Sequence, residues 1–380
     1  MRFARSSSLA LFPALVLVSN CQLCAGPVQF ATPMLEPSPF LLWDLALTLR
    51  GGGGYKDNPS YAGTNVFREP SSFESIGAEL LVTHLPTDGR EFYLFFTGDD
   101  RRYFDAPDVR KEQVFTTQAQ FKQTVADWTY SLAGQHFYAD QVLDLSDQSS
   151  GFGVAQVSGN TLSLTPALRR TWNGNWWLEG ELNLSRQYFG GDLDSYWEGT
   201  PRLTLGHDYG NKSQVKLSLS VAGRPYDNST LLDTSGNFLP DTHQELLRRS
   251  ARLTWKHVWD AERHWQTTLQ GSASRLEDNG VGYADYDKFA AVAELQFESG
   301  RWLAAVKGGF ARSAYAVQRT DGLSGDLRQR DEVNVDARLE FRLGKKLKLV
   351  GSYEFERSLA NVSFDLYTVN SFFGGLEWEL

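Results

Sequence analysis

Apolar and polar residues alternate with a period of two along almost the whole chain. In the clearest window, from Val333 to Leu343, six apolar residues alternate with five polar ones without an error. The same period recurs at 45–49, 178–184 and 215–221. A period of two places successive side chains on opposite faces of a strand. The pattern therefore predicts an all-β chain whose strands each have one apolar and one polar face.

The predicted strands are too long, and their connections too regular, for a soluble β-sandwich. Most windows span about 12–15 residues, whereas ordinary strands have about five or six. Tight turns fall near 86–89, 126–127, 173–175, 210–212, 260–263, 299–301 and 344–346. Longer polar loops fall near 56–71, 104–111, 144–153, 190–195, 227–243, 278–285, 318–327 and 357–366. Short turns at one rim and longer loops at the other are typical of transmembrane barrels.

These connections predict a transmembrane antiparallel up-and-down β-barrel over residues 40–380. The barrel has about sixteen strands, with fourteen as the alternative, and an even number places both termini on the tight-turn, periplasmic side. Closure pairs every backbone N–H and C=O group, as a lipid environment demands. Pro166 falls inside the sixth predicted strand and removes an amide donor, so we expect a bulge or a local kink there.

Aromatic residues gather at the predicted strand ends, which indicates two girdles at the membrane boundaries. Beside the tight turns lie Trp128, Trp172, Trp176, Trp177, Trp259, Trp265 and Trp302. Beside the longer loops lie Tyr103, Phe104, Tyr138, Tyr188, Phe189, Tyr226, Tyr286, Tyr315 and Tyr367. The alternative interpretation is the packed core of a soluble sandwich.

Composition excludes several other classes of protein. The 380 residues are 41% hydrophobic, 22% charged and 13% aromatic, and they lack the repeated apolar runs of roughly 18 residues that a polytopic helical membrane protein needs. The aromatic content excludes a disordered chain. The net charge of −9 argues against a nucleic-acid partner that is bound through phosphate neutralisation.

The first 25 residues have the pattern of a signal peptide. Arg2 and Arg5 precede an apolar run over 9–18, and cleavage is expected after Ala25. Lipidation at Cys21 and an uncleaved anchor are the alternatives. Cleavage removes both cysteines and changes the net charge to −11. The proline-rich residues 26–39 then form a periplasmic leader, which is also a candidate plug for the barrel mouth.

The C-terminus carries a second export signature, in which Phe372, Gly374, Leu376, Trp378 and Leu380 share one face. This looks like the closing-strand signal by which barrel-assembly machinery recognises its clients. The chain thus resembles bacterial outer-membrane β-barrels of the porin-like kind. The segments 51–58 (GGGGYKDN) and 353–361 (YEFERSLAN) resemble poorly characterised barrels, some of them linked to exopolysaccharide or surface-protein systems. The resemblance implies an outer-membrane location and contact with membrane lipid and lipopolysaccharide. It transfers no functional residues.

If the apolar face contacts lipid, the polar face lines the lumen. Alternation assigns to the lumen Arg50, Glu79, Lys122, Arg169, Glu179, Glu181, Arg202, Lys216, Arg252, Lys256, Glu294, Lys307, Asp336, Arg338, Glu340, Arg342 and Glu354, with Asp99, Lys348, Glu377 and Glu379. Charges in such numbers need water or partners, and sixteen strands enclose enough space for an aqueous channel. The cations of strands eight to ten are separate from Glu179 and Glu181 on strand seven. This separation indicates either a transverse electric field or salt-bridge ladders between neighbouring strands.

Most of the remaining acidic residues fall in the longer loops. The acids are Asp192, Asp194, Asp227, Asp233, Asp241, Glu245, Asp278, Asp285 and Asp287. They predict either divalent-cation binding at the lipopolysaccharide surface or a solvated acidic rim. Residues 227–243 form the longest of the predicted loops and are the best candidate for a constriction loop that folds inward.

No enzymatic signature is present, and we expect no enzyme activity, no metal site and no cofactor. The sequence lacks G-x-S-x-G, H-E-x-x-H and P-loop motifs, and its six histidines are scattered. The leading hypothesis is an outer-membrane barrel that forms a passive or weakly selective channel for small polar solutes. The alternatives are a plugged or gated barrel for export or display of a surface polymer or surface protein, and a hydrolase with its site at the rim.

Overall fold

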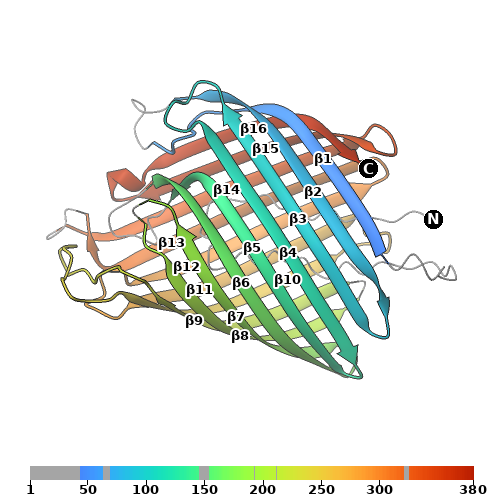
Figure 1. Ribbon diagram of the computed structural model, residues 1–380, viewed down its shortest axis with the longest axis horizontal. Coiled ribbons are helices and arrows are strands. Elements are labelled where there is room, and N and C mark those ends of the chain that lie inside the picture. The colour runs from blue at the N-terminus through green and yellow to red at the C-terminus, as the bar shows by residue number, and fades with distance from the viewer. Residues whose placement is uncertain (1–42, 63–68, 145–153, 192, 211, 321–324) are drawn as a thin grey trace.

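Sixteen antiparallel strands form one closed barrel in the computed structural model of the chain (Figure 1). The structure describes residues 43–62, 69–144, 154–191, 193–210, 212–320 and 325–380, so the predicted signal peptide and leader lie outside the described residues. The strands are β1 (Trp43–Lys56), β2 (Ser71–Thr87), β3 (Arg90–Tyr103), β4 (Lys111–Val125), β5 (Trp128–Asp144), β6 (Val154–Trp172), β7 (Trp176–Phe189), β8 (Tyr196–Tyr209), β9 (Ser213–Pro225), β10 (Glu245–Val258), β11 (Trp265–Asp278), β12 (Tyr286–Ser299), β13 (Trp302–Arg319), β14 (Leu327–Arg342), β15 (Leu347–Ala360) and β16 (Tyr367–Glu379). Each strand pairs with its sequence neighbours, and β1 pairs with β16 to close the barrel. The sixteen-stranded up-and-down prediction is confirmed, and the fourteen-stranded alternative is wrong.

Helical structure in the described residues is limited to one short 3-10 turn, η2 (Ser363–Asp365). None of the described helices has the length and apolar character required to cross a membrane. The closed strand ladder is therefore the element that organises the fold.

The tight turns gather at one rim of the barrel and the longer loops at the other. Asp88 and Gly89 both have positive φ, and so do Asn173 and Gly174. Two consecutive residues in this conformation match the twist of a hairpin, and Asp-Gly and Asn-Gly adopt it most readily. β1 begins and β16 ends at the tight-turn rim (Figure 1). The placement of that rim in the periplasm stays a prediction.

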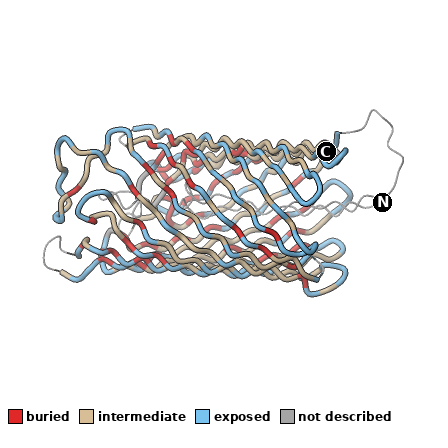
Figure 2. Tube along the Cα trace, turned by 90° about the horizontal axis from the view of Figure 1, so that it is seen from below, coloured by how far each residue is buried: buried red, intermediate tan, exposed pale blue. Residues whose placement is uncertain are grey.

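The exterior of the wall is apolar along the middle of the strands. Large aliphatic side chains that alternate with less exposed polar ones include Leu45, Leu132, Leu164, Leu219, Leu253 and Val306. Figure 2 shows this wall with largely exposed turns and loops at its two rims. A continuous apolar exterior is unfavourable in water because soluble proteins rarely expose patches beyond a few hundred Å². It is the surface that lipid requires.

Pro166 does not produce the predicted bulge. β6 and β7 keep one register on both sides of it, from Leu164 opposite Leu184 to Ala167 opposite Glu181. The ladder is interrupted only between these pairs, because proline has no N–H to donate. Register shifts occur elsewhere, in β2 after His84 and in β13 after Ala314.

Six of the seven tryptophans predicted for the tight-turn girdle are exposed on the outer face. These are Trp128, Trp172, Trp176, Trp259, Trp265 and Trp302. The prediction for Trp177 is wrong, since only 2% of this residue is exposed. Trp176 and Trp177 are consecutive strand residues, so their side chains must point to opposite faces.

The second predicted girdle is incomplete. Phe104 and Tyr188 are exposed, but Tyr103, Tyr286, Tyr315 and Tyr367 are at most 8% exposed and lie on the inner face. Tyr286 and Tyr315 pack together with Leu246 and Leu276 in a small apolar cluster. Position near a loop was therefore a poor guide to their direction, whereas alternation along each strand assigns them correctly.

Candidate channel lining

The twenty-one charged residues predicted for the lumen all lie on the face of the wall opposite the exposed apolar side chains. None of them is in the exposed class. They are distributed over β1 (Arg50), β2 (Glu79), β3 (Asp99), β4 (Lys122), β6 (Arg169), β7 (Glu179, Glu181), β8 (Arg202), β9 (Lys216), β10 (Arg252, Lys256), β12 (Glu294), β13 (Lys307), β14 (Asp336, Arg338, Glu340, Arg342), β15 (Lys348, Glu354) and β16 (Glu377, Glu379). Their role in conduction stays a prediction, and their geometry shows which of them interact.

A dense ion-pair network covers the inner face of β14–β16. Lys348 Nζ lies 2.7 Å from Glu379 Oε1 and 3.1 Å from Glu377 Oε1. Arg338 Nε donates to Glu340 Oε1 at 2.7 Å, and its Nη2 lies 3.1 Å from Glu377 Oε2. Two cations thus pair with three carboxylates and leave a formal charge of −1, and these ion pairs hold β14, β15 and β16 together near the closing strand.

Other pairs bridge strands that are not adjacent, which only side chains inside a curved wall can do. Lys56 on β1 donates to Glu112 on β4 at 2.8 Å, and Tyr103 Oη donates to the same carboxylate at 2.8 Å. Arg101 on β3 lies 3.4 Å from Glu354 on β15, across three intervening strands. These charges therefore meet over the inner surface.

A cavity of about 110 Å³ lies beside these pairs, lined by residues from β1–β5 and β14–β16. Tyr61, from the loop after β1, forms part of its wall, and Lys56 Nζ lies 4.8 Å from the Tyr61 ring centroid. Asn58 is fully buried and its side-chain amide donates to Thr368 O at 3.1 Å. Burial raises the pKa of Tyr61 well above its usual value. The described part of this loop thus packs against the inner wall.

On β6–β8 the charged residues form ladders between adjacent strands. Arg169 Nε donates to Glu179 Oε2 at 3.0 Å, and Arg202 Nη1 donates to Glu181 Oε1 at 3.1 Å. Of the two predicted acids of strand seven, Glu179 therefore pairs with β6 and Glu181 pairs with β8. This supports the ladder interpretation for these four residues.

The inner face of β8–β10 is rich in cations, and the wall opposite is rich in acids. β8–β10 carry Arg202, Lys216, Arg224, Arg248, Arg252 and Lys256 against Glu198 and Asp208. Opposite them, β15, β16, β1 and β2 carry Glu354, Glu356, Glu377, Glu379, Asp44 and Glu79 against Lys348, Arg50 and Lys56. A separation of charge of this kind across the lumen generates a transverse field. Glu179 and Glu181, the acids for which the field was predicted, lie in the ladders instead, and a field across the lumen stays a prediction.

Trp177 is a lumen residue that the sequence analysis placed on the wrong face. The Arg169 guanidinium lies 3.8 Å from the centroid of its ring. A Cβ on Gly206 would overlap the Trp177 ring, so glycine makes room for the indole on the neighbouring strand. Trp177 lies two and four positions before Glu179 and Glu181 on β7, and this even spacing identifies it as a residue of the inner face.

The predicted constriction loop, residues 227–243, is bonded at both ends to neighbouring loops, and its role as a constriction stays a prediction. Asp227 N donates to Ser195 O at 2.9 Å in one neighbouring loop, and Asn279 Nδ2 donates to His243 O at 2.9 Å from the other. The two ends of the loop are thus held at the rim by its neighbours. It is the loop after β1 that reaches the inner wall.

The loop carboxylates are largely used to close their own turns. Asp278 accepts hydrogen bonds from the N–H groups of Gly280, Gly282 and Ala284 at 2.8–2.9 Å. The backbone N–H of Asn237 donates to Asp233 and holds the pKa of that carboxyl below its usual range. Because these oxygens already accept amide protons, the arrangement favours turn stabilisation over cation binding.

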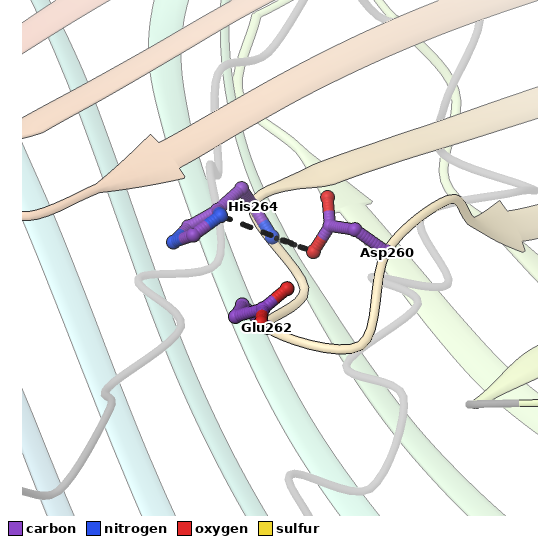
Figure 3. Close-up of side chains that lie close together, drawn as sticks. All are labelled: Asp260, Glu262 and His264. Atoms are coloured by element: carbon purple, nitrogen blue, oxygen red, sulfur yellow. Dashed lines mark hydrogen bonds and ion pairs between the residues drawn. The ribbon is translucent and has the colours of Figure 1, made fainter.

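Among the described residues, Asp260, Glu262 and His264 are grouped closely enough to hold a metal ion (Figure 3). They belong to the turn between β10 and β11. Asp260 Oδ1 accepts the N–H of His264 at 2.7 Å and Oδ2 accepts the N–H of Trp265 at 2.9 Å. The carboxylate therefore closes the turn.

Comparison with solved structures finds several outer-membrane proteins, at low similarity. Acinetobacter baumannii OccAB1 has a TM-score of 0.49 and 9% identity, with 89% of this chain and 96% of that chain covered. Pseudomonas aeruginosa OccK9 (OpdG) has a TM-score of 0.48 and 12% identity, with 89% and 98% covered. An anion-selective porin from Comamonas acidovorans has a TM-score of 0.46 and 8% identity, with 89% and 99% covered. No protein-family model and no curated protein matches the chain.

Proposed function

We propose that this barrel lies in the bacterial outer membrane and forms a channel for small polar solutes. The observation that carries the proposal is the division of the closed wall into an apolar exterior and a charged inner face. Lipid accommodates the first, and water accommodates the second. Sixteen strands enclose a lumen wide enough for solutes. The proposal includes no enzymatic activity.

The charged walls add a selection step to this channel. A solute that carries both charges gains from the cations of β8–β10 and from the acids opposite, whereas an apolar solute loses its hydration and gains nothing. Weak selectivity for polar and charged solutes follows. The outward residues of β16 from Phe372 to Trp378, together with Leu380 after the strand, form the surface that we propose the assembly machinery recognises.

Proteoliposome swelling tests the channel proposal. Vesicles that contain the folded protein should swell in isosmotic sugars and amino acids, at rates that fall steeply as solute size increases. Vesicles with the same lipid but without protein are the control. Equal swelling rates for both preparations, with the barrel shown to be inserted, would instead favour a plugged or gated export barrel.

Lys216→Glu should shift the ion selectivity of the channel toward cations. The change replaces a positive with a negative charge on the inner face of β9, and a unit charge acts on an ion about 6 Å away in water by ~0.7 kcal/mol. A three- to tenfold fall in the anion-to-cation permeability ratio is therefore expected, measured as a reversal potential in a salt gradient. The matched control is Arg170→Glu, which makes the same charge change on the outer face. An equal shift in both variants would contradict the assignment of Lys216 to the lumen.

A further inference from the structure

Six strands carry a cation on their outer face at a constant distance from an aromatic residue at the other rim. The aromatic and cationic residues are ten positions apart, an even number that places both on one face. The pairs are Phe92 and Arg102, Phe121 and Lys111, Trp176 and Arg186, Trp259 and Arg249, Trp265 and Arg275, and Trp302 and Arg312. No Lys or Arg stands between the two members on that face in any of these strands.

The constant spacing measures the height of the apolar band. Ten residues extend for about 33 Å along a strand, and a tilt of about 45° reduces this to a height of about 23 Å. Barrels in outer membranes have an apolar band about 25 Å tall. The six cations therefore lie where the hydrocarbon ends at the long-loop rim, and the aromatics lie where it ends at the other.

The two boundaries differ in chemistry. The tight-turn boundary consists mainly of aromatic rings, with ring contacts such as Trp265 with Phe297 and Trp302 with Phe341. The outward strand cations there are Arg90 and Arg170. The long-loop boundary carries these six cations and Arg357 on β15, interleaved with carboxylates. A protein with unlike boundaries fits a membrane whose two leaflets have unlike headgroups.

The arginines of β10 and β11 are the best-organised part of the long-loop boundary. Arg249 and Arg275 face each other in register, and both contact Glu277, with N–O distances of 3.1 and 3.0 Å. Their side chains are 58% and 57% exposed. One carboxylate thus contacts two guanidinium groups, and the outer wall is apolar at Leu253, four register pairs further along β10. Guanidinium donors of this kind bind phosphate with two parallel hydrogen bonds.

We propose that the outward cations of the long-loop rim bind the phosphate groups of a phosphorylated glycolipid, the lipid A part of lipopolysaccharide, with Arg249 and Arg275 as the principal site. The acyl chains of this lipid lie against the apolar band, and its phosphates reach the guanidinium groups at the band edge. The neighbouring carboxylates hold the guanidinium groups in place. This inference rests on the outer-membrane location of the proposed function but not on conduction.

The test is lipid retention by the purified barrel in detergent, followed by native mass spectrometry. The probes are lipid A with two phosphates and dephosphorylated lipid A. The variants are Arg249→Gln with Arg275→Gln, and Arg170→Gln as a matched outward change at the other rim. Folding is confirmed for each by heat-modified gel mobility, and Arg275→Gln alone replaces the double variant if that variant does not fold.

Wild type and Arg170→Gln should retain diphosphorylated lipid A and release the dephosphorylated form. The arginine double variant should bind diphosphorylated lipid A at least about tenfold more weakly, which corresponds to ~1.4 kcal/mol. Equal retention by the double variant and wild type, or an equal loss in Arg170→Gln, would overturn the site. The double variant should keep wild-type swelling activity in vesicles free of lipid A, so failure of the lipid site and failure of the channel are distinguishable.

Discussion

Leu269→Arg is expected to destabilise the folded barrel by ~2–4 kcal/mol, the cost of a cation near the middle of the bilayer on the lipid face. Leu269 is 43% exposed on β11. It lies between Trp265 and Arg275, the two residues that mark the edges of the apolar band on that strand. The measurement is the free energy of unfolding in lipid vesicles, from a reversible denaturant titration.

Gln270→Arg is the control for this change. Gln270 follows Leu269 directly and lies on the inner face, opposite Thr254 on β10. The same side chain introduced there enters the polar lumen, so we expect a change below about 1 kcal/mol. Similar losses in the two variants would mean that the assignment of inner and outer faces is wrong.

Asp365→Asn is expected to destabilise the last long loop by ~3 kcal/mol, because it leaves a buried guanidinium without the carboxylate that balances its charge. Arg328 Nε and Nη2 each lie 2.7 Å from a different oxygen of Asp365. The side chains of the pair are 4% and 0% exposed, and the guanidinium also lies 4.4 Å from the Tyr315 ring centroid. Hydrogen exchange of the amides at 361–366 measures the loss, and faster exchange is expected.

Asp331→Asn is the matched comparison. Asp331 forms a similar two-point pair with Arg312, but this arginine side chain is 57% exposed. An exposed ion pair contributes about 0–1 kcal/mol. Exchange rates near Asp331 should therefore change little. If the two variants behaved alike, burial would not be what makes the Arg328 pair important.

Strand periodicity predicted most of this fold because the wall repeats one rule sixteen times. Each residue faces either lipid or lumen, so one misassigned position is visible against its neighbours. The tight turns were equally predictable, since Asp88-Gly89 and Asn173-Gly174 adopt positive φ more easily than other pairs. The charged face followed from the same alternation.

The wrong predictions came from residues that were assigned to a face by their proximity to a turn or loop and not by alternation along their strand. Trp177 was grouped with Trp176 because both adjoin a turn, yet their side chains point in opposite directions. Tyr315 and Tyr367 were assigned to a girdle because they flank loops, yet both are buried inside. Ion pairs between strands that are not adjacent were beyond prediction, since Arg101 and Glu354 lie 253 residues apart and meet only after closure.

Single-channel conductance in a planar bilayer tests the central claim most directly. A wide polar lumen predicts discrete current steps for each inserted barrel, with a size that rises in proportion to salt concentration. The Lys216→Glu variant should show steps with altered ion preference, which ties the current to the barrel itself. A barrel that is shown to be folded and inserted, and yet gives no current steps in wild type, would contradict the account.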